Sequence, residues 1–465
     1  MYDVKSEHTR IKKNPMHNTG KILLLLFLGY VSLMAADPSI DENALFSDTA
    51  SLVAASTLSD TQKIKDPSEK KGTSIGGDII AASLASANRD FFTHYRLANT
   101  SLMNLLVGSV ELDARLPNET KVYGNLEVDY MPALDSLTRY SLSLRELFLD
   151  VNANRRAYFR IGKQVLQWGR CYFWNPTDLV NVERKTFIEK IGSREGVLGA
   201  KAHVPFGTVA NIYGFLDLHS ATRADSLALS VKGEYLVGAT EMALSAWGKR
   251  GKPVVIGYDI STRLLGLDIS GELSVSNGDV KPHIALRDSL LWMDTVKNGV
   301  TPRISLGISR SFDFMGFHNA LLVEAEGFYN GGGYYENIFA DTARYGIAGY
   351  VPQMGPTGVP MPQPRITKSE YLFGSGLYDA NYHSPYYAAL FVGISRFLIS
   401  DLTFNINGIM NISQLCGIVT GSIGYTTLSN LTIGAMIIGY VGKERTEYTF
   451  PGQSMALRLT ADVRF

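Results

Sequence analysis

The chain has only two cysteines, Cys171 and Cys416, in 465 residues, and they lie far apart in sequence. This number excludes a disulfide framework, and we expect both thiols to be free. Acidic and basic residues number 44 each, so the formal net charge is +0 and nothing favours a nucleic-acid partner. Charged residues make up 19% of the chain, less than in an ordinary globular domain.

Long apolar runs are also scarce. The segment 22–34 is strongly apolar, but it is shorter than the roughly 20 residues that a spanning helix needs. Lys21 precedes this run and Ala35-Ala36 follows it, a pattern typical of a secretory signal peptide. We therefore expect residues 1–36 to be a signal peptide, with Met16 as an alternative true start. Export leaves the periplasm, the outer membrane or secretion as destinations.

Catalytic and metal-binding patterns are absent from the sequence. It shows no His/Cys set at zinc spacing and no phosphate-binding glycine loop, so we expect no metal and no cofactor. Asp217 and His219 share one face of an expected strand, but a nucleophile with an orienting group is missing. We expect a protein that is not an enzyme.

The end of the chain, 453–465, alternates between apolar and polar side chains. Since side chains of a strand point to opposite faces in turn, one face of this strand suits an apolar environment and the other suits water. A soluble sandwich could contain such a strand. The pattern also resembles the closing strand of bacterial outer-membrane barrels, and this resemblance implies that Phe465 is the signal read by the barrel-assembly machinery.

Similar alternation recurs from residue 74 onward in segments of about ten residues, without helical segments between them. Short turns alternate with long connections, notably 165–194, 276–300 and 330–384, and the last of these is expected to be loop because it is rich in Gly, Pro and Tyr. We predict an all-β fold: a closed antiparallel transmembrane barrel of about 18 strands, with 16 or 14 as alternatives, short periplasmic turns and long extracellular loops. Residues 37–73 are expected to be a flexible periplasmic segment and 74–465 the barrel.

Charged side chains on the polar faces are expected to line the lumen. With a turn centred near Ala153, Glu146 would face Arg160 and Asp150 would face Arg156. These charges either brace the wall or set an electrostatic field along a pore. Acidic side chains outnumber basic ones in the assigned lumen, which predicts weak cation preference. The residues predicted to line the pore are Glu146, Asp150, Arg156, Arg160, Asp268, Glu272, Glu324, Glu326 and Arg458.

One stretch of the chain has a recognisable signature. Gly162-Lys163-Gln164, Trp168-Gly169 and Asn175-Pro176-Thr177-Asp178 follow one another within 162–178. This order resembles porin-like outer-membrane proteins of the alginate-export-like group. The resemblance implies a channel with an extracellular loop folded inward as a constriction. In this sequence that loop would contain Trp168, Arg170, Asp178, Arg184 and Lys185. Alternatively, the tryptophans could belong to an interfacial aromatic girdle.

Together these features predict a bacterial outer-membrane porin for passive passage of small hydrophilic solutes. The alternative is a non-conducting surface protein, such as an adhesin, whose barrel only anchors its loops. Expected partners are outer-membrane lipid, the barrel-assembly machinery and small hydrophilic solutes. The solute and the oligomeric state stay open.

Overall fold

The chain forms one closed antiparallel sheet of 18 strands, which confirms the predicted fold class and strand number. The structure, a computed structural model, describes residues 72–88, 100–116, 119–132, 139–166, 168–180, 196–218, 227–295, 299–350, 363–427, 430–450 and 452–465. The barrel strands are β1 (Gly72–Asn88), β2 (Thr100–Arg115), β3 (Lys121–Met131), β4 (Arg139–Ala153), β5 (Ala157–Gln164), β6 (Val197–Phe206), β7 (Ala210–Asp217), β8 (Ala228–Val237), β9 (Thr240–Lys249), β10 (Val255–Leu264), β11 (Leu267–Asn277), β14 (Val300–Phe314), β15 (Phe317–Asn330), β17 (Tyr386–Ile394), β18 (Leu402–Asn411), β19 (Cys416–Thr426), β20 (Leu431–Val441) and β21 (Gln453–Arg464).

The last strand closes the barrel as the sequence predicts. β21 pairs with β1, and Arg464 lies opposite Asp78. One residue further on, Phe465 and Gly77 exchange two backbone hydrogen bonds of 3.0 Å each. The apolar row of β21 faces outward, and its row with Arg458 and Arg464 faces inward, where Arg458 lies between Leu84 of β1 and Met436 of β20.

The outer wall is largely apolar. Large side chains such as Leu229, Leu244, Leu306 and Leu390 are about half exposed on it. A soluble protein would not leave so many apolar side chains on one continuous surface. Because the sheet is closed, its backbone groups are paired all round, which the hydrocarbon of a bilayer requires. The fold is therefore that of an outer-membrane barrel.

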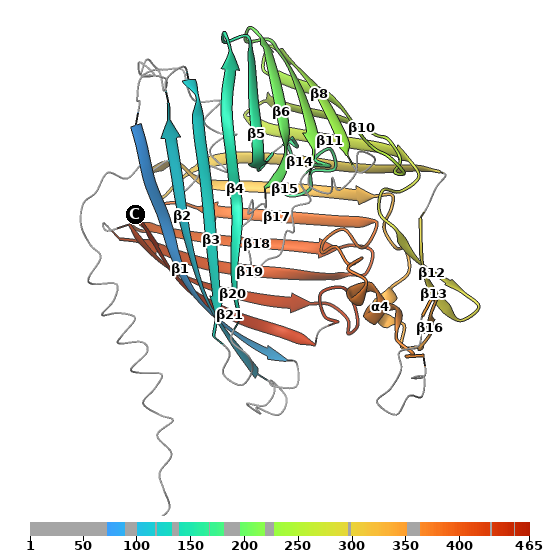
Figure 1. Cartoon of the computed structure of the whole chain (residues 1–465). Coiled ribbons are helices and arrows are strands. Elements are labelled where there is room, and N and C mark those ends of the chain that lie inside the picture. Colours follow the sequence, from blue (N-terminus) through green and yellow to red (C-terminus); the bar gives the residue numbers. More distant parts are fainter. Residues whose placement is uncertain are drawn as a thin grey trace, which may run out of the picture.

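Most connections alternate in length as predicted, although 412–415 between β18 and β19 is shorter than 395–401 before it. The long connections contain structure that the sequence did not reveal. The strands β12 (His283–Arg287), β13 (Leu290–Asp294) and β16 (Gly346–Ile347) form a small second sheet. With η6 (Ile338–Ala340) and α4 (Lys368–Gly374) they lie beyond the end of the barrel away from the C-terminus (Figure 1). We call these five elements the cap.

Helix α4 corrects the expectation that 330–384 is loop alone. Its N-terminus has a capping box, in which Thr367 accepts from the Glu370 backbone N–H and the Glu370 carboxylate accepts from the Thr367 N–H. The spacing Ser/Thr-x-x-Glu, here Thr367 to Glu370, marks the start of this helix in the sequence, although the surrounding segment is rich in Gly and Pro. Among the described residues, no helix is long and apolar enough to cross a membrane.

The predicted register of the β4–β5 hairpin is wrong. Asp150 lies opposite Arg160, and Ala153 lies opposite Ala157, so Arg156 belongs to the turn and faces no carboxylate of β4. The turn is centred at Arg155 because Asn154 and Arg155 both adopt positive φ, at 52° and 57°. The shift in pairing is even, so every side chain stays on its predicted face.

The boundary of the barrel also moves slightly. β1 begins at Gly72, so two residues assigned to the flexible lead-in belong to the sheet. The predicted signal peptide and most of the predicted periplasmic segment lie outside the described residues.

Candidate functional site

The chain leaves the barrel wall at the end of β5. Gly162 there has a φ of +133°, and a Cβ atom on it would lie 2.2 Å from the Leu147 carbonyl oxygen, so only glycine fits. The Gln164 side chain is fully buried and donates to the Gly199 carbonyl at 3.3 Å. The next residue, Val165, donates its N–H to the Glu146 carboxylate at 2.8 Å. Residues 168–180 then run inside the barrel, and we call them the inner loop.

Glu272 of β11 fastens the inner loop at two points. One carboxylate oxygen accepts the N–H groups of Arg170 and Cys171, at 2.6 and 2.8 Å. The other accepts the N–H and hydroxyl of Thr177, at 3.1 and 2.7 Å. The side chain is only 2% exposed because the loop covers it. Four donors converging on one carboxylate satisfy its charge without a cation.

Glu326 of β15 makes a second tether of the same kind. Its carboxylate accepts the N–H groups of Phe173 and Trp174, at 2.9 and 2.5 Å, and the Ser305 hydroxyl at 2.9 Å. The Trp174 ring is completely buried, stacks on Phe328 with centroids 5.4 Å apart, and donates its indole N–H to the Asn381 carbonyl at 3.0 Å. The loop is thus held by hydrogen bonds and by a packed aromatic side chain together.

Arg170 joins the inner loop to a cluster of wall carboxylates. Its guanidinium contacts Asp259 at 2.5 Å, Glu234 at 3.2 Å and also Glu241. Lys232 lies 3.2 Å from both Glu234 and Asp259 and donates to the Trp168 carbonyl. Two cations among three carboxylates make a nearly balanced network inside the barrel.

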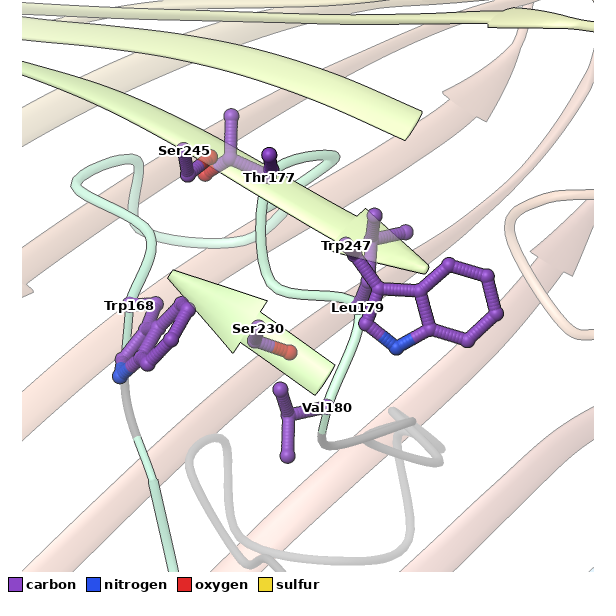
Figure 2. Close-up of a pocket in the computed structure, with 8 residues that line it drawn as sticks. Trp168, Thr177, Leu179, Val180, Ser230, Ser245 and Trp247 are labelled. Atoms are coloured by element: carbon purple, nitrogen blue, oxygen red, sulfur yellow. The ribbon is translucent and has the colours of Figure 1, made fainter. Parts of the chain in front are cut away.

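A small pocket lies between the inner loop and the strands β8 and β9. Trp168 and Trp247 lie on opposite sides of it, with Ser230 of β8 between them and Ser245 of β9 beside Thr177 (Figure 2). Trp168 is 6% exposed, and its backbone N–H donates to the Asp178 carboxylate at 3.5 Å. Because Trp168 and Trp174 are buried inside the barrel, the alternative that they form an interfacial girdle is wrong.

The predicted pore-lining residues fall into three groups: some are buried under the inner loop, some form ion pairs along the wall, and some are partly exposed on the inward face. Glu146, Glu272 and Glu326 face inward, but Glu272 and Glu326 are buried under the loop instead of facing open water. The carboxylate of Asp150 accepts two hydrogen bonds from the Arg160 guanidinium, at 2.6 and 2.8 Å.

The remaining predicted residues are more exposed or lie elsewhere. Asp268 is paired with Arg263 at 2.7 and 2.8 Å. Glu324 and Arg458 lie on the inward face, partly exposed. Arg184 and Lys185 lie outside the described residues.

Several residues of the site were not predicted from the sequence, among them Glu234 and Glu241 of the Arg170 cluster. Asp259 is completely buried beside Arg170. In β10 the residues Val255, Gly257 and Asp259 occupy one face, and the larger Ile256 and Tyr258 occupy the other. This alternation could have placed Asp259 on the inward face. Arg145, which contacts Glu127 at 3.0 Å, faces inward because a bulge in the β3–β4 pairing places it beside Glu146 on the same face.

Comparisons with known proteins agree on the fold. Neither a protein family nor a curated protein matches the sequence. Among solved structures, Acinetobacter baumannii OccAB3 is similar with a TM-score of 0.50 at 10% identity, over 84% of this chain and 99% of that one. OccAB1 of the same organism gives 0.50 at 10% identity, over 86% and 98%. A BenF-like porin from Pseudomonas fluorescens Pf-5 gives 0.48 at 9% identity, over 85% and 99%. The likeness to OccAB3 and OccAB1 shows that the chain shares the barrel fold of these structures.

Proposed function

We propose that the protein is an outer-membrane channel for passive passage of small hydrophilic solutes, with the inner loop as its constriction. The observation behind this proposal is that residues 168–180 cross the inside of the barrel and are tethered to the walls on β11 and β15. A barrel that served only as an anchor would gain nothing from a loop fixed in this way. Many buried hydrogen bonds are instead what a constriction of defined width requires.

We also propose that the likeness to the alginate-export-like group lies in this loop. The motif residues Gly162, Gln164, Trp168 and Thr177 make the exit from the wall and the tethers. Gly169 packs against the Asn175 side chain, where a Cβ atom would come within 2.2 Å of the Asn175 Oδ1 atom. The motif thus has a mechanical purpose in this chain, which supports a shared loop design and leaves the solute unspecified.

Ion preference is proposed to depend on the inward charges that are not covered. Glu272 and Glu326 are covered by the loop and accept hydrogen bonds from it, so they face the lumen less directly than the sequence suggested. Glu324 lies on the inward face of β15, and no ion pair to it is found within the described residues. Charge reversal in Glu324→Lys should therefore reduce cation preference, measured as the reversal potential in a salt gradient across a planar bilayer.

The competing function is surface adhesion, which the size of the cap favours. Conductance separates the two functions. Purified protein reconstituted in planar bilayers should show discrete conductance steps, and deletion of 171–176 should increase their size. If neither form conducts after folding has been verified by heat-modifiable migration, the adhesin function replaces the channel.

We further propose that Phe465 is the signal for the barrel-assembly machinery and that outer-membrane lipid surrounds the wall. The backbone hydrogen bonds between Phe465 and Gly77 at the closing seam support this assignment.

A further inference from the structure

One part of the inner wall is apolar, although the inside of an outer-membrane barrel is ordinarily polar. It lies on the inward rows of β1 and β2, where three apolar residues of one strand face three of the other. The members are Ile80, Ala82 and Leu84 of β1, which lie opposite Val107, Leu105 and Met103 of β2. We call these six residues the apolar strip.

The alternation along β1 decides which way the strip faces. Ile80 and Leu84 share the inward row of the strand with Asp78, whereas Ile79 in the other row is 43% exposed on the outer wall. All six members of the strip are partly exposed. A solute inside the barrel can therefore reach them.

The inner loop covers the strip only at one corner. Leu84 of the strip and Met436 of β20 pack against the buried cluster that contains Phe173 and Trp174. In the described part of the chain, the other five members belong to no buried apolar cluster. Apolar side chains gain free energy when they are removed from water. Five partly exposed ones side by side in the lumen therefore form a surface that favours an apolar group.

Carboxylates border the strip on the side of β3 and toward the C-terminal end of the barrel. Asp129 of β3 lies directly opposite Val107, and Glu127 lies opposite Ser109. Asp78 of β1 also lies opposite Ser109. Asp78 and Asp129 accept hydrogen bonds from neutral hydroxyl groups, and no ion pair with lysine or arginine is found for either within the described residues.

Cations are fewer than carboxylates at this border. Glu111, the next inward residue of β2, accepts from the neutral amide of Asn125 at 3.1 Å. Arg145 contacts Glu127 at 3.0 Å, and Arg464 lies opposite Asp78. Two arginines thus stand beside four carboxylates, so the β3 border has an excess of negative charge.

The border on β21 has no such excess. Arg458 and Asp462 lie there, opposite Leu84 and Ile80. Three strand spacings, or roughly 14 Å, separate this border from Asp129 on β3, which is more than the roughly 8 Å over which exposed charges interact at physiological salt. The strip thus offers an apolar surface with negative charge along one side.

We propose that the apolar strip binds passing solutes that carry both a positive charge and an apolar ring or chain. The apolar group lies on Ile80, Leu105 and Val107, and the cation lies beside Asp129 and Glu127. This inference rests on the proposed channel function and names the class of solute that the channel favours. An apolar ring on the strip should strengthen binding about tenfold over a cation that has no ring. An anion with the same ring should be repelled by the border.

Protection of an introduced thiol tests the proposal without any need for conduction. Full-length protein with Cys171→Ala and Cys416→Ala has no native thiol, and Ala82→Cys then places one in the strip. The rate of alkylation by neutral iodoacetamide is measured with increasing benzyltrimethylammonium, tetramethylammonium or benzenesulfonate. We expect half-protection at an about tenfold lower concentration of benzyltrimethylammonium than of tetramethylammonium, and no protection by benzenesulfonate.

The matched control thiol is Ser309→Cys in the same background. Ser309 is partly exposed on the inward face of β14, between Asp268 and Glu324, so it has carboxylate neighbours without an apolar strip. The two cations should protect this thiol equally. Equal protection by the two cations at Ala82→Cys, protection there by benzenesulfonate, or no alkylation there at all would each overturn the proposal.

A change within the strip gives a second measurement. Leu105→Ser, combined with Ala82→Cys, should abolish the tenfold difference between the two cations, and an unchanged difference would contradict the strip. Val107→Thr, which keeps the shape of the side chain, should reduce the difference and serves if Leu105→Ser does not assemble.

The two proposals fail in different ways. The expected protection in a protein that never conducts would refute the channel and leave the binding strip standing. Conductance without the expected protection would refute the strip and leave the channel standing.

Discussion

Replacing Glu272 by glutamine tests whether wall carboxylates hold the inner loop. The carboxylate accepts two hydrogen bonds at each oxygen, from Arg170 and Cys171 on one side and from Thr177 on the other. A glutamine amide can accept at one end only, so two of the four bonds are lost. At roughly 1.5 kcal/mol for each bond to a charged group, docking weakens by about 3 kcal/mol, or roughly 100-fold.

The assay has two readouts on the same purified protein. Single-channel recording should show larger or longer openings for Glu272→Gln. Trypsin should cleave after Arg170, whose guanidinium is held among carboxylates while the loop is docked. For cleavage the matched control is Glu324→Gln, on the inward face of β15 two residues before the tether Glu326, which should be cleaved as slowly as the unsubstituted protein. If Glu272→Gln conducts and is cleaved as the unsubstituted protein is, the tether argument is refuted.

Three further outcomes are expected. Deletion of Phe465 should lower the yield of assembled, heat-modifiable barrel far more than it changes conductance, and assembly at normal yield would contradict its role. Gly162→Ala should also lower the yield, because its backbone and close contacts exclude a Cβ atom, whereas Gly233→Ala, with open space around it, should assemble normally. Arg160→Gln should destabilise the barrel by about 0.2–1 kcal/mol in urea unfolding, and Arg156→Gln should leave it unchanged, which checks the observed register.

Most of the barrel could be predicted from the sequence because alternation is a local property. Except for Ala456, which is apolar but lies in the inward row, the residues of β21 show by their polarity which face they occupy. Register is less local. The β4–β5 pairing depends on where the turn lies, and Asn154 and Arg155 show no glycine to mark it.

The roles of inward carboxylates could not be predicted in the same way. Alternation shows that Glu272, Glu324 and Glu326 share the inner side of the wall, but not which of them a loop will cover. That depends on contacts across 95 to 153 residues of sequence, such as those from Glu272 to Thr177 and from Glu326 to Phe173. A count of inward charges therefore overestimates the field that a solute would meet.

The distance in sequence between the inner loop and its tethers also has a consequence for the order of folding. The loop follows β5, but the carboxylates that hold it belong to β11 and β15, which are synthesised later and reach it only when the wall curves round. Docking of the loop must therefore come after most strands have paired, since such distant contacts form late. In a barrel with one strand too few or one pairing slipped, Glu272 and Glu326 would not meet the same loop. The inner loop can therefore dock only in a barrel with the correct number and register of strands. In a wrongly closed barrel the inner loop would stay undocked.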